Sequence, residues 1–193
     1  MATFLPPVEK PRGLLLRVVY FLTRRQFGKV ATPIAVFSAR MPTSFLTFYG
    51  KVSKLDKSLQ LPSDTRVLIR ERVATINGCA FCMDATRWYT LRESPDDVVR
   101  LDALDEYRTS PLFTDAERVP LDYTTELVTD KHVKAETFER LARHYNERQI
   151  CDIVWLVASE HLYNISNIAL NIGSDGLCAL SAVTRKGALE AAS

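Results

Sequence analysis

The stretch LPSDTRVLIRERVATINGCAFCMDA, residues 61–85, joins a helix-forming segment to a pair of cysteines. On a helical wheel the apolar residues of 66–77 point in several directions, which is typical of a helix surrounded by protein. Arg70, Glu71 and Arg72 lie in the same segment, and buried charges must be paired. We therefore expect a central helix over residues 66–77 in which Arg70, Glu71 and Arg72 all have partners.

The cysteine pair Cys79 and Cys82 follows Asn77-Gly78, a dipeptide that interrupts a helix, and precedes a run with helical character. The pair is therefore predicted at a helix N-terminus, where backbone N–H groups can lower a thiol pKa from about 8.5 to between about 3.5 and 7.5. A spacing of three places both sulfurs on one face, close enough for a disulfide. This pattern favours a redox pair over two buried cysteines that act only as small apolar side chains.

A structural zinc site is the other chemistry that closely spaced cysteines can indicate. Such a site needs four ligands, and the remaining cysteines, Cys151 and Cys178, are solitary. The histidines His132, His144 and His161 show no paired spacing. The sequence therefore argues against zinc, and we interpret Cys151 and Cys178 as structural.

The composition limits the partners that the chain can have. Its 193 residues suit one domain, and 25 Lys and Arg against 23 Asp and Glu give a charge of +2, which argues against a nucleic-acid partner. Four cysteines do not form the dense framework of a secreted domain, so we expect a cytoplasmic protein. No apolar segment reaches the roughly 18–20 residues of a membrane span, so no membrane partner is expected.

The rest of the chain is predicted to be helical, because capping residues and apolar spacing of 3.6 recur along it. We expect a flexible N-terminal arm over residues 1–12, one all-helical domain over residues 13–176, and a C-terminal tail over residues 177–193. Beyond the central helix, the predicted helices span residues 94–104, 114–128, 135–145 and 147–172, the last capped by Gly173. In this last helix His161, Asn164, Asn167 and Asn171 form a polar stripe, which we interpret as a solvated or interfacial face, with a role in the active site as the less favoured alternative.

Three segments together resemble one known family. Residues 61–85, FTDAERVPLDYTTELVTD (113–130) and ERQICDIVWLVASEHLYNISNIALNIG (147–173) resemble the alkylhydroperoxidase D-like and carboxymuconolactone decarboxylase superfamily, over about residues 40 to 176. The cysteine pair points to its C-x-x-C branch. The resemblance implies an all-α helical bundle that assembles into a homo-oligomer, a trimer or a multiple of it, or a dimer.

The resemblance also implies a chemistry. In that branch the second cysteine, here Cys82, reduces a hydroperoxide and becomes a sulfenic acid, and the first, here Cys79, resolves it as a disulfide. An external dithiol then resets the pair, and no metal or organic cofactor is required.

The chain departs from the family motif at its proton relay. The motif has a glutamate twelve residues before the first cysteine and a histidine four residues after the second, and these positions are Val67 and Thr86 here. General acid and base groups are worth about 10² to 10⁴ in rate. Glu71 lies one turn after Val67 and is predicted either to replace the base or to pair with an arginine. Thr86 either bonds the thiolate or bonds its own helix backbone.

These observations predict a thiol–disulfide oxidoreductase with peroxidase-like activity, whose candidate catalytic residues are Cys79, Cys82, Glu71 and Thr86. Its substrate would be a hydroperoxide or a small disulfide, and its electron donor a dithiol. Two alternatives stay open: a non-catalytic scaffold, ligand-binding or redox-sensing protein, and a lactone or decarboxylation enzyme on the same fold. The last ranks lowest because no histidine lies near the cysteine motif in the sequence.

Overall fold

The computed structural model describes residues 2–179, and this range contains helices and turns but no strand, which confirms the predicted all-α fold. Nor does it contain a helix with the length and apolar character of a bilayer-crossing segment. Met1 and residues 180–193, the larger part of the predicted tail, lie outside the described residues. The elements are α1 (Leu14–Phe27), η1 (Ile34–Ser38), α2 (Pro42–Lys57), α3 (Ser63–Asn77), α4 (Ala80–Glu93), η2 (Pro95–Asp97), α5 (Val98–Asp102), η3 (Leu104–Glu106), α6 (Asp115–Asp130), α7 (Ala135–His144) and α8 (Glu147–Ile168).

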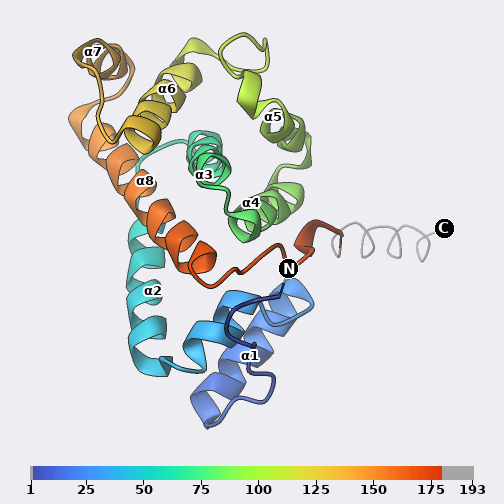
Figure 1. Ribbon diagram of the computed structural model, residues 1–193. Coiled ribbons are helices and arrows are strands. Elements are labelled where there is room, and N and C mark those ends of the chain that lie inside the picture. Colours follow the sequence, from blue (N-terminus) through green and yellow to red (C-terminus); the bar gives the residue numbers. More distant parts are fainter. Residues whose placement is uncertain (1, 180–193) are drawn as a thin grey trace, which may run out of the picture.

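Helix α3 is the centre of the bundle, with α4, α6 and α8 packed around it (Figure 1). Ile69 and Val73 of α3 have no exposed surface and share one apolar core with Ile153 and Leu156 of α8. Burying one such side chain is worth about 1.5–3 kcal/mol relative to leaving it exposed. The central helix predicted from residues 66–77 is confirmed, and it begins three residues earlier, at Ser63.

Arg70, Glu71 and Arg72 of α3 all find partners inside the chain. Arg70 pairs with Asp56 and Glu160, each at 2.8 Å. In the same helix Glu71 accepts from Arg87 at 2.9 Å, while Arg72 pairs with Asp105 at 2.9 Å. These contacts confirm the predicted pairing of the three side chains. The oligomer itself stays a prediction.

Capping side chains set the starts of the last two long helices. Thr114 and Glu117 form a reciprocal capping box at α6, and Asn146 and Gln149 form one at α8. The predicted helix over 94–104 is instead divided into η2, α5 and η3. Helix α8 ends at Ile168, four residues before the predicted end at 172. The left-handed conformation that ends the helix is taken by Asn171, at φ 54°, and not by the predicted cap, Gly173.

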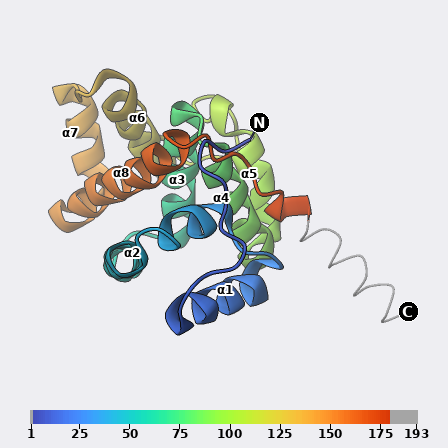
Figure 2. The same ribbon diagram turned by 60° about the horizontal axis from the view of Figure 1, so that its bottom comes forward.

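The N-terminal arm lies across the end of α8 and also contacts α1, where Tyr20 OH donates to Val8 O at 2.7 Å. Phe4 N donates to Leu170 O at 3.0 Å, and Asn171 Nδ2 donates to Ala2 O at 2.7 Å. Figures 1 and 2 both show this arm next to the chain that leaves α8, with α1 and α2 on the same side of the bundle. The arm, α1 and α2 therefore enclose the side of the bundle on which α4 and α8 end.

Candidate active site

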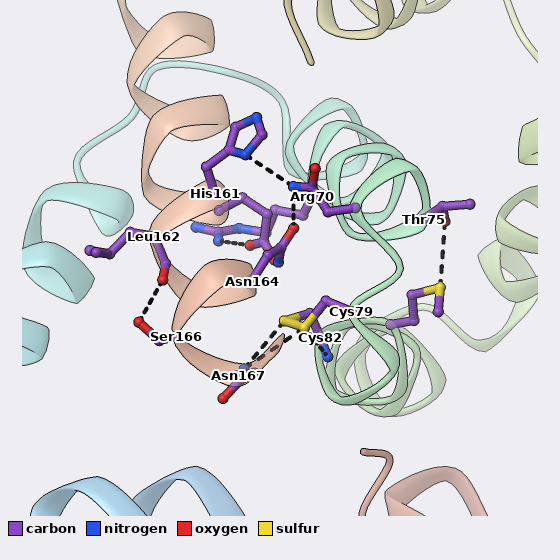
Figure 3. Close-up of a disulfide and its surroundings, with 12 residues drawn as sticks. Arg70, Thr75, Cys79, Cys82, His161, Leu162, Asn164, Ser166 and Asn167 are labelled. Atoms are coloured by element: carbon purple, nitrogen blue, oxygen red, sulfur yellow. Dashed lines mark hydrogen bonds and ion pairs between the residues drawn. A yellow bond between two sulfur atoms is a disulfide. The ribbon is translucent and has the colours of Figure 1, made fainter. Parts of the chain in front are cut away.

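The turn between α3 and α4 places the two cysteines. Gly78 ends α3 in the left-handed conformation, at φ 70°, which favours glycine because it has no Cβ. Cys79 is then the N-cap of α4, and its sulfur accepts from Cys82 N at 3.4 Å. The two cysteines form a disulfide with their Cα atoms 5.3 Å apart (Figure 3). The structure thus places the pair at a helix N-terminus, as the sequence predicts.

Asn167 of α8 is the side chain that meets the two sulfurs. Its Nδ2 donates to Cys82 Sγ at 3.4 Å and to Cys79 Sγ at 3.8 Å, and Figure 3 shows it next to the disulfide. Asn164 and Asn167 are both buried, so the prediction that their stripe is a solvated or interfacial face is wrong for these two residues. The sequence shows that these asparagines lie on one face of α8, but only the packing of α8 shows that Asn167 faces the two sulfurs.

A separate group of polar contacts lies one turn earlier along α8. Asn164 Nδ2 donates to Glu160 Oε1 at 2.7 Å, and Asn77 Nδ2 donates to Asn164 Oδ1 at 2.9 Å. Asn77 Nδ2 also lies 3.0 Å from His161 Nδ1. His161, which is distant from the cysteines in the sequence, therefore contacts Asn77, two residues before Cys79 (Figure 3).

A cavity of about 700 Å³ opens beside the cysteine pair. Both cysteines are buried, with Cys79 1% and Cys82 6% exposed, but Cys82 and Asn167 line the cavity and Cys79 does not. Six aromatic side chains from α1, α2, α4 and α8 also line the cavity: Phe27, Phe45, Tyr49, Phe81, Tyr89 and Tyr163. Of the two cysteines, Cys82 is therefore the one that a molecule in the cavity can meet.

Both positions of the family's proton relay face this cavity. Val67 and Thr86 are among the residues that line it, beside Cys82. A valine cannot exchange a proton, and the threonine hydroxyl does not act as a base near neutral pH. The cavity wall beside the sulfur therefore lacks acid–base groups at the two positions where the family has them.

Glu71 is fully enclosed, and only one of its oxygens has a partner. Arg87 Nε donates to Oε1, while Oε2 is buried without a hydrogen-bond partner among residues 2–179. Burial outweighs the attraction of Arg87 and raises the Glu71 pKa to about 7. Glu71 is not among the cavity-lining residues, but Ala74, one turn further along α3, packs on both cysteines.

Asp84 anchors the chain that follows α8. Its carboxylate accepts from Ser174 Oγ at 2.8 Å and from the backbone N–H groups of Leu177 and Cys178. Burial would raise the Asp84 pKa, but these donors outweigh it and hold the pKa below its ordinary value. Burial and the contact with Asp84 raise the pKa of the Cys178 thiol to about 11. Asp84 is therefore a structural anchor, and Cys178 is a weakly reactive thiol.

The chain has a sequence relative that it matches over almost its whole length. No family profile matches the sequence. The chain is 33% identical over 176 residues to the uncharacterised protein YnjA of Escherichia coli (strain K12), which covers 90% of this chain and 95% of YnjA. The two chains are therefore related over almost their whole lengths.

Two solved structures share the fold. The debrominase Bmp8 in complex with 2,3,4-tribromopyrrole matches with a TM-score of 0.76 at 20% identity, over 92% of this chain and 94% of Bmp8. A peroxidase-related protein from Ralstonia eutropha JMP134, described as an alkylhydroperoxidase AhpD core, matches with a TM-score of 0.70 at 20% identity, over 89% and 95% of the two chains. This chain therefore belongs to the family of YnjA, and it has the fold of the AhpD-like and debrominase structures.

Proposed function

We propose that the protein is a thiol–disulfide oxidoreductase that reduces organic hydroperoxides with the Cys79–Cys82 pair. The observation that carries this proposal is the geometry of the pair: Cys82 lines a cavity of about 700 Å³ and is bonded to the buried Cys79 behind it. A peroxidatic sulfur needs access to substrate, and a resolving sulfur needs access only to its partner. The fold and the C-x-x-C pair support a redox role at the level of the family.

The proposed cycle has three balanced steps. The Cys82 thiolate attacks one peroxide oxygen, the O–O bond breaks, and the substrate leaves as an alcohol after taking up a proton, while Cys82 becomes a sulfenic acid. The Cys79 thiol then attacks the Cys82 sulfur and releases water as the disulfide forms. A dithiol finally reduces the disulfide and is itself oxidised to a disulfide.

Two hydrogen bonds to the sulfurs support these roles. The amide of Asn167 donates to Cys82 Sγ, and a hydrogen bond to the charged form of a group favours that form. The α4 N-terminus acts on Cys79 in the same way, through Cys82 N–H. Glu71, with a pKa near 7 and one unpaired oxygen, is proposed to accept and return the proton. We propose that Thr86, in the cavity wall, bonds the substrate or the thiolate.

A second candidate function is reductive dehalogenation of an aromatic ring. The ring-lined cavity favours it, as does the fold shared with a debrominase. In this reaction the Cys82 thiolate takes the halogen from carbon, the ring carbon takes a proton, and Cys79 displaces halide from sulfur as the disulfide forms. Each disulfide would then accompany one halide ion and one ring in which hydrogen replaces halogen.

The experiment uses a background in which the other two cysteines cannot react, Cys151→Ser with Cys178→Ala, because Cys151 is exposed. Reduced protein is mixed with cumene hydroperoxide, and thiol loss and cumyl alcohol are measured together. We expect one alcohol per disulfide and recovery of both thiols with dithiothreitol. Adding Cys79→Ser should leave a sulfenic acid that dimedone traps on Cys82, and adding Cys82→Ser should abolish the reaction.

The same preparation separates the alternatives. Bromide release from 2,3,4-tribromopyrrole without hydroperoxide turnover would favour the dehalogenase. If the reduced pair consumes neither substrate, the oxidoreductase proposal fails and a non-catalytic or sensory role remains. Equal peroxide consumption by the Cys79→Ser and Cys82→Ser proteins would contradict the assignment of the two cysteines to different roles.

A further inference from the structure

The cavity beside Cys82 is larger and more aromatic than a peroxide group requires. The rings of Phe45 and Tyr49 stack with centroids 4.1 Å apart, and Tyr49 lies 5.2 Å from Tyr163, so these rings form a continuous wall. Tyr163 also packs on the two cysteines. Aromatic walls of this kind favour a planar ring, which they contact by stacking or by edge-to-face packing. The wall therefore favours a ring-containing occupant beside the reactive sulfur.

The charged side chains that line the cavity are not equivalent. Asp56 and Glu160 are both bound by Arg70, so their charges are already balanced by a partner. Glu93 also lines the cavity, but it is exposed and therefore screened by water. Arg66 differs: its Nε is buried without a hydrogen-bond partner, and its guanidinium makes no ion pair within residues 2–179. Arg66 is half-buried, and a guanidinium without an ion-pair partner among these residues is suited to bind an anion in the cavity.

We propose that the cavity binds an elongated aromatic carboxylate, with its carboxylate on Arg66 and its far end against Cys82. Arg66 lies eight residues before Ala74, which packs on both cysteines, and eight residues of helix span about 12 Å. A ligand with two rings in line has about the length that this separation needs. The proposal rests on the redox function of the site for its physiological meaning, but binding can be tested without any turnover.

The binding experiment uses the oxidised protein, which cannot react, and calorimetry with two probes of the same shape. Biphenyl-4-carboxylate carries the anion, and biphenyl-4-carboxamide is its neutral counterpart. We expect the carboxylate to bind about 10-fold or more tightly than the amide, because a charge-assisted contact replaces a neutral one. Arg66→Gln should remove this preference while leaving amide binding unchanged, and Arg66→Lys should keep part of it.

A control and a second probe complete the test. Arg143→Gln removes an exposed arginine on α7 and should change neither affinity. Decanoate, an anion of similar length without rings, should bind more weakly than biphenyl-4-carboxylate. If decanoate binds more tightly, or if the carboxylate and the amide bind equally to the unchanged protein, the proposed ligand class is wrong.

Protection of the cysteine shows whether the probe occupies this cavity. In reduced protein with Cys151→Ser and Cys178→Ala, saturating biphenyl-4-carboxylate should slow alkylation of Cys82 by iodoacetamide, and Arg66→Gln should need more probe for the same protection. Tight binding without protection would place the probe elsewhere and overturn the proposal. A protein that fails these binding tests but turns over hydroperoxide would refute the ligand class and keep the redox function. A protein that binds the probe as expected but turns over no hydroperoxide would keep the ligand class and refute hydroperoxide reduction.

Discussion

Asn167 links the end of α8 to both sulfurs, and its amide is aimed at them from 3.4 and 3.8 Å. In the reduced protein this donor should stabilise a thiolate on Cys82. We expect Asn167→Ala to raise the Cys82 thiol pKa by about one to two units, since a hydrogen bond to a charged group is worth about 1.5–3 kcal/mol and one pKa unit is 1.36 kcal/mol.

The measurement is the rate of Cys82 alkylation across pH, with Cys151 and Cys178 replaced. Ile165→Ala, which truncates an exposed side chain on α8, is the matched control and should not shift the profile. An Asn167→Ala profile that coincides with that of the parent protein would show that the amide only packs against the sulfurs.

Glu71 makes stability depend on pH in an unusual direction for a paired carboxylate. Its folded-state pKa of about 7 exceeds the ordinary value of 4.5, so between these pH values the folded protein binds more protons than the unfolded chain. The contribution of Glu71 to the free energy of unfolding therefore falls as pH rises from about 4.5 to about 7. Urea unfolding at pH 5 and pH 7.5 should show this fall, and Glu71→Gln should reduce it. An unchanged pH dependence in the variant would mean that the carboxyl is ionised throughout.

At the scale of helices, α3 depends on the ion pairs that its neighbours provide. Arg70 balances Asp56 of α2 and Glu160 of α8 at once, and Glu160 is fully buried. Arg70→Met should therefore cost about 3–5 kcal/mol in the free energy of unfolding, because it leaves two carboxylates without their cation. Arg140→Ala, which removes a half-exposed partner of Asp122, should cost less than about 1 kcal/mol. Equal losses in the two variants would show that the Arg70 pairs contribute no more than a surface contact.

The sequence predicted the helices better than it predicted their contacts. Capping pairs such as Thr114 with Glu117 are local, so residues three apart are enough to locate the start of α6. The Asn167 contact joins positions 85 and 88 residues apart, and no local pattern encodes it. The cavity likewise needs Phe27 and Tyr49 from α1 and α2, whose packing against α4 and α8 depends on the whole bundle. The cysteine pair could be predicted because its chemistry lies within one turn of helix.

At the scale of the whole molecule, α1 carries an apolar stripe that the described chain leaves exposed. Leu14, Leu15, Val18, Phe21 and Leu22 are between 46 and 78% exposed and lie on one side of the helix. A stripe of this kind is typical of a surface that another molecule covers. We propose that a second copy of this chain covers it, in the homo-oligomer that the family resemblance implies.

Light scattering coupled to size-exclusion chromatography tests this assembly. We expect the unchanged protein to elute as an oligomer and Phe21→Glu to shift it to a smaller species. Val99→Glu, at an exposed position on α5, should leave the mass unchanged. A monomeric parent protein would rule out the assembly, and an unaffected Phe21→Glu oligomer would place its interface away from α1.

The central claim is that Cys82, and not Cys79, is the accessible nucleophile of the site. The most direct measurement is alkylation of the fully reduced protein by iodoacetamide from pH 5 to pH 9, with each cysteine followed separately by peptide mass spectrometry. The structure predicts that Cys82 reacts first, with a thiol pKa well below the ordinary value of about 8.5. A faster reaction at Cys79, or a Cys82 pKa at or above 8.5, would contradict it.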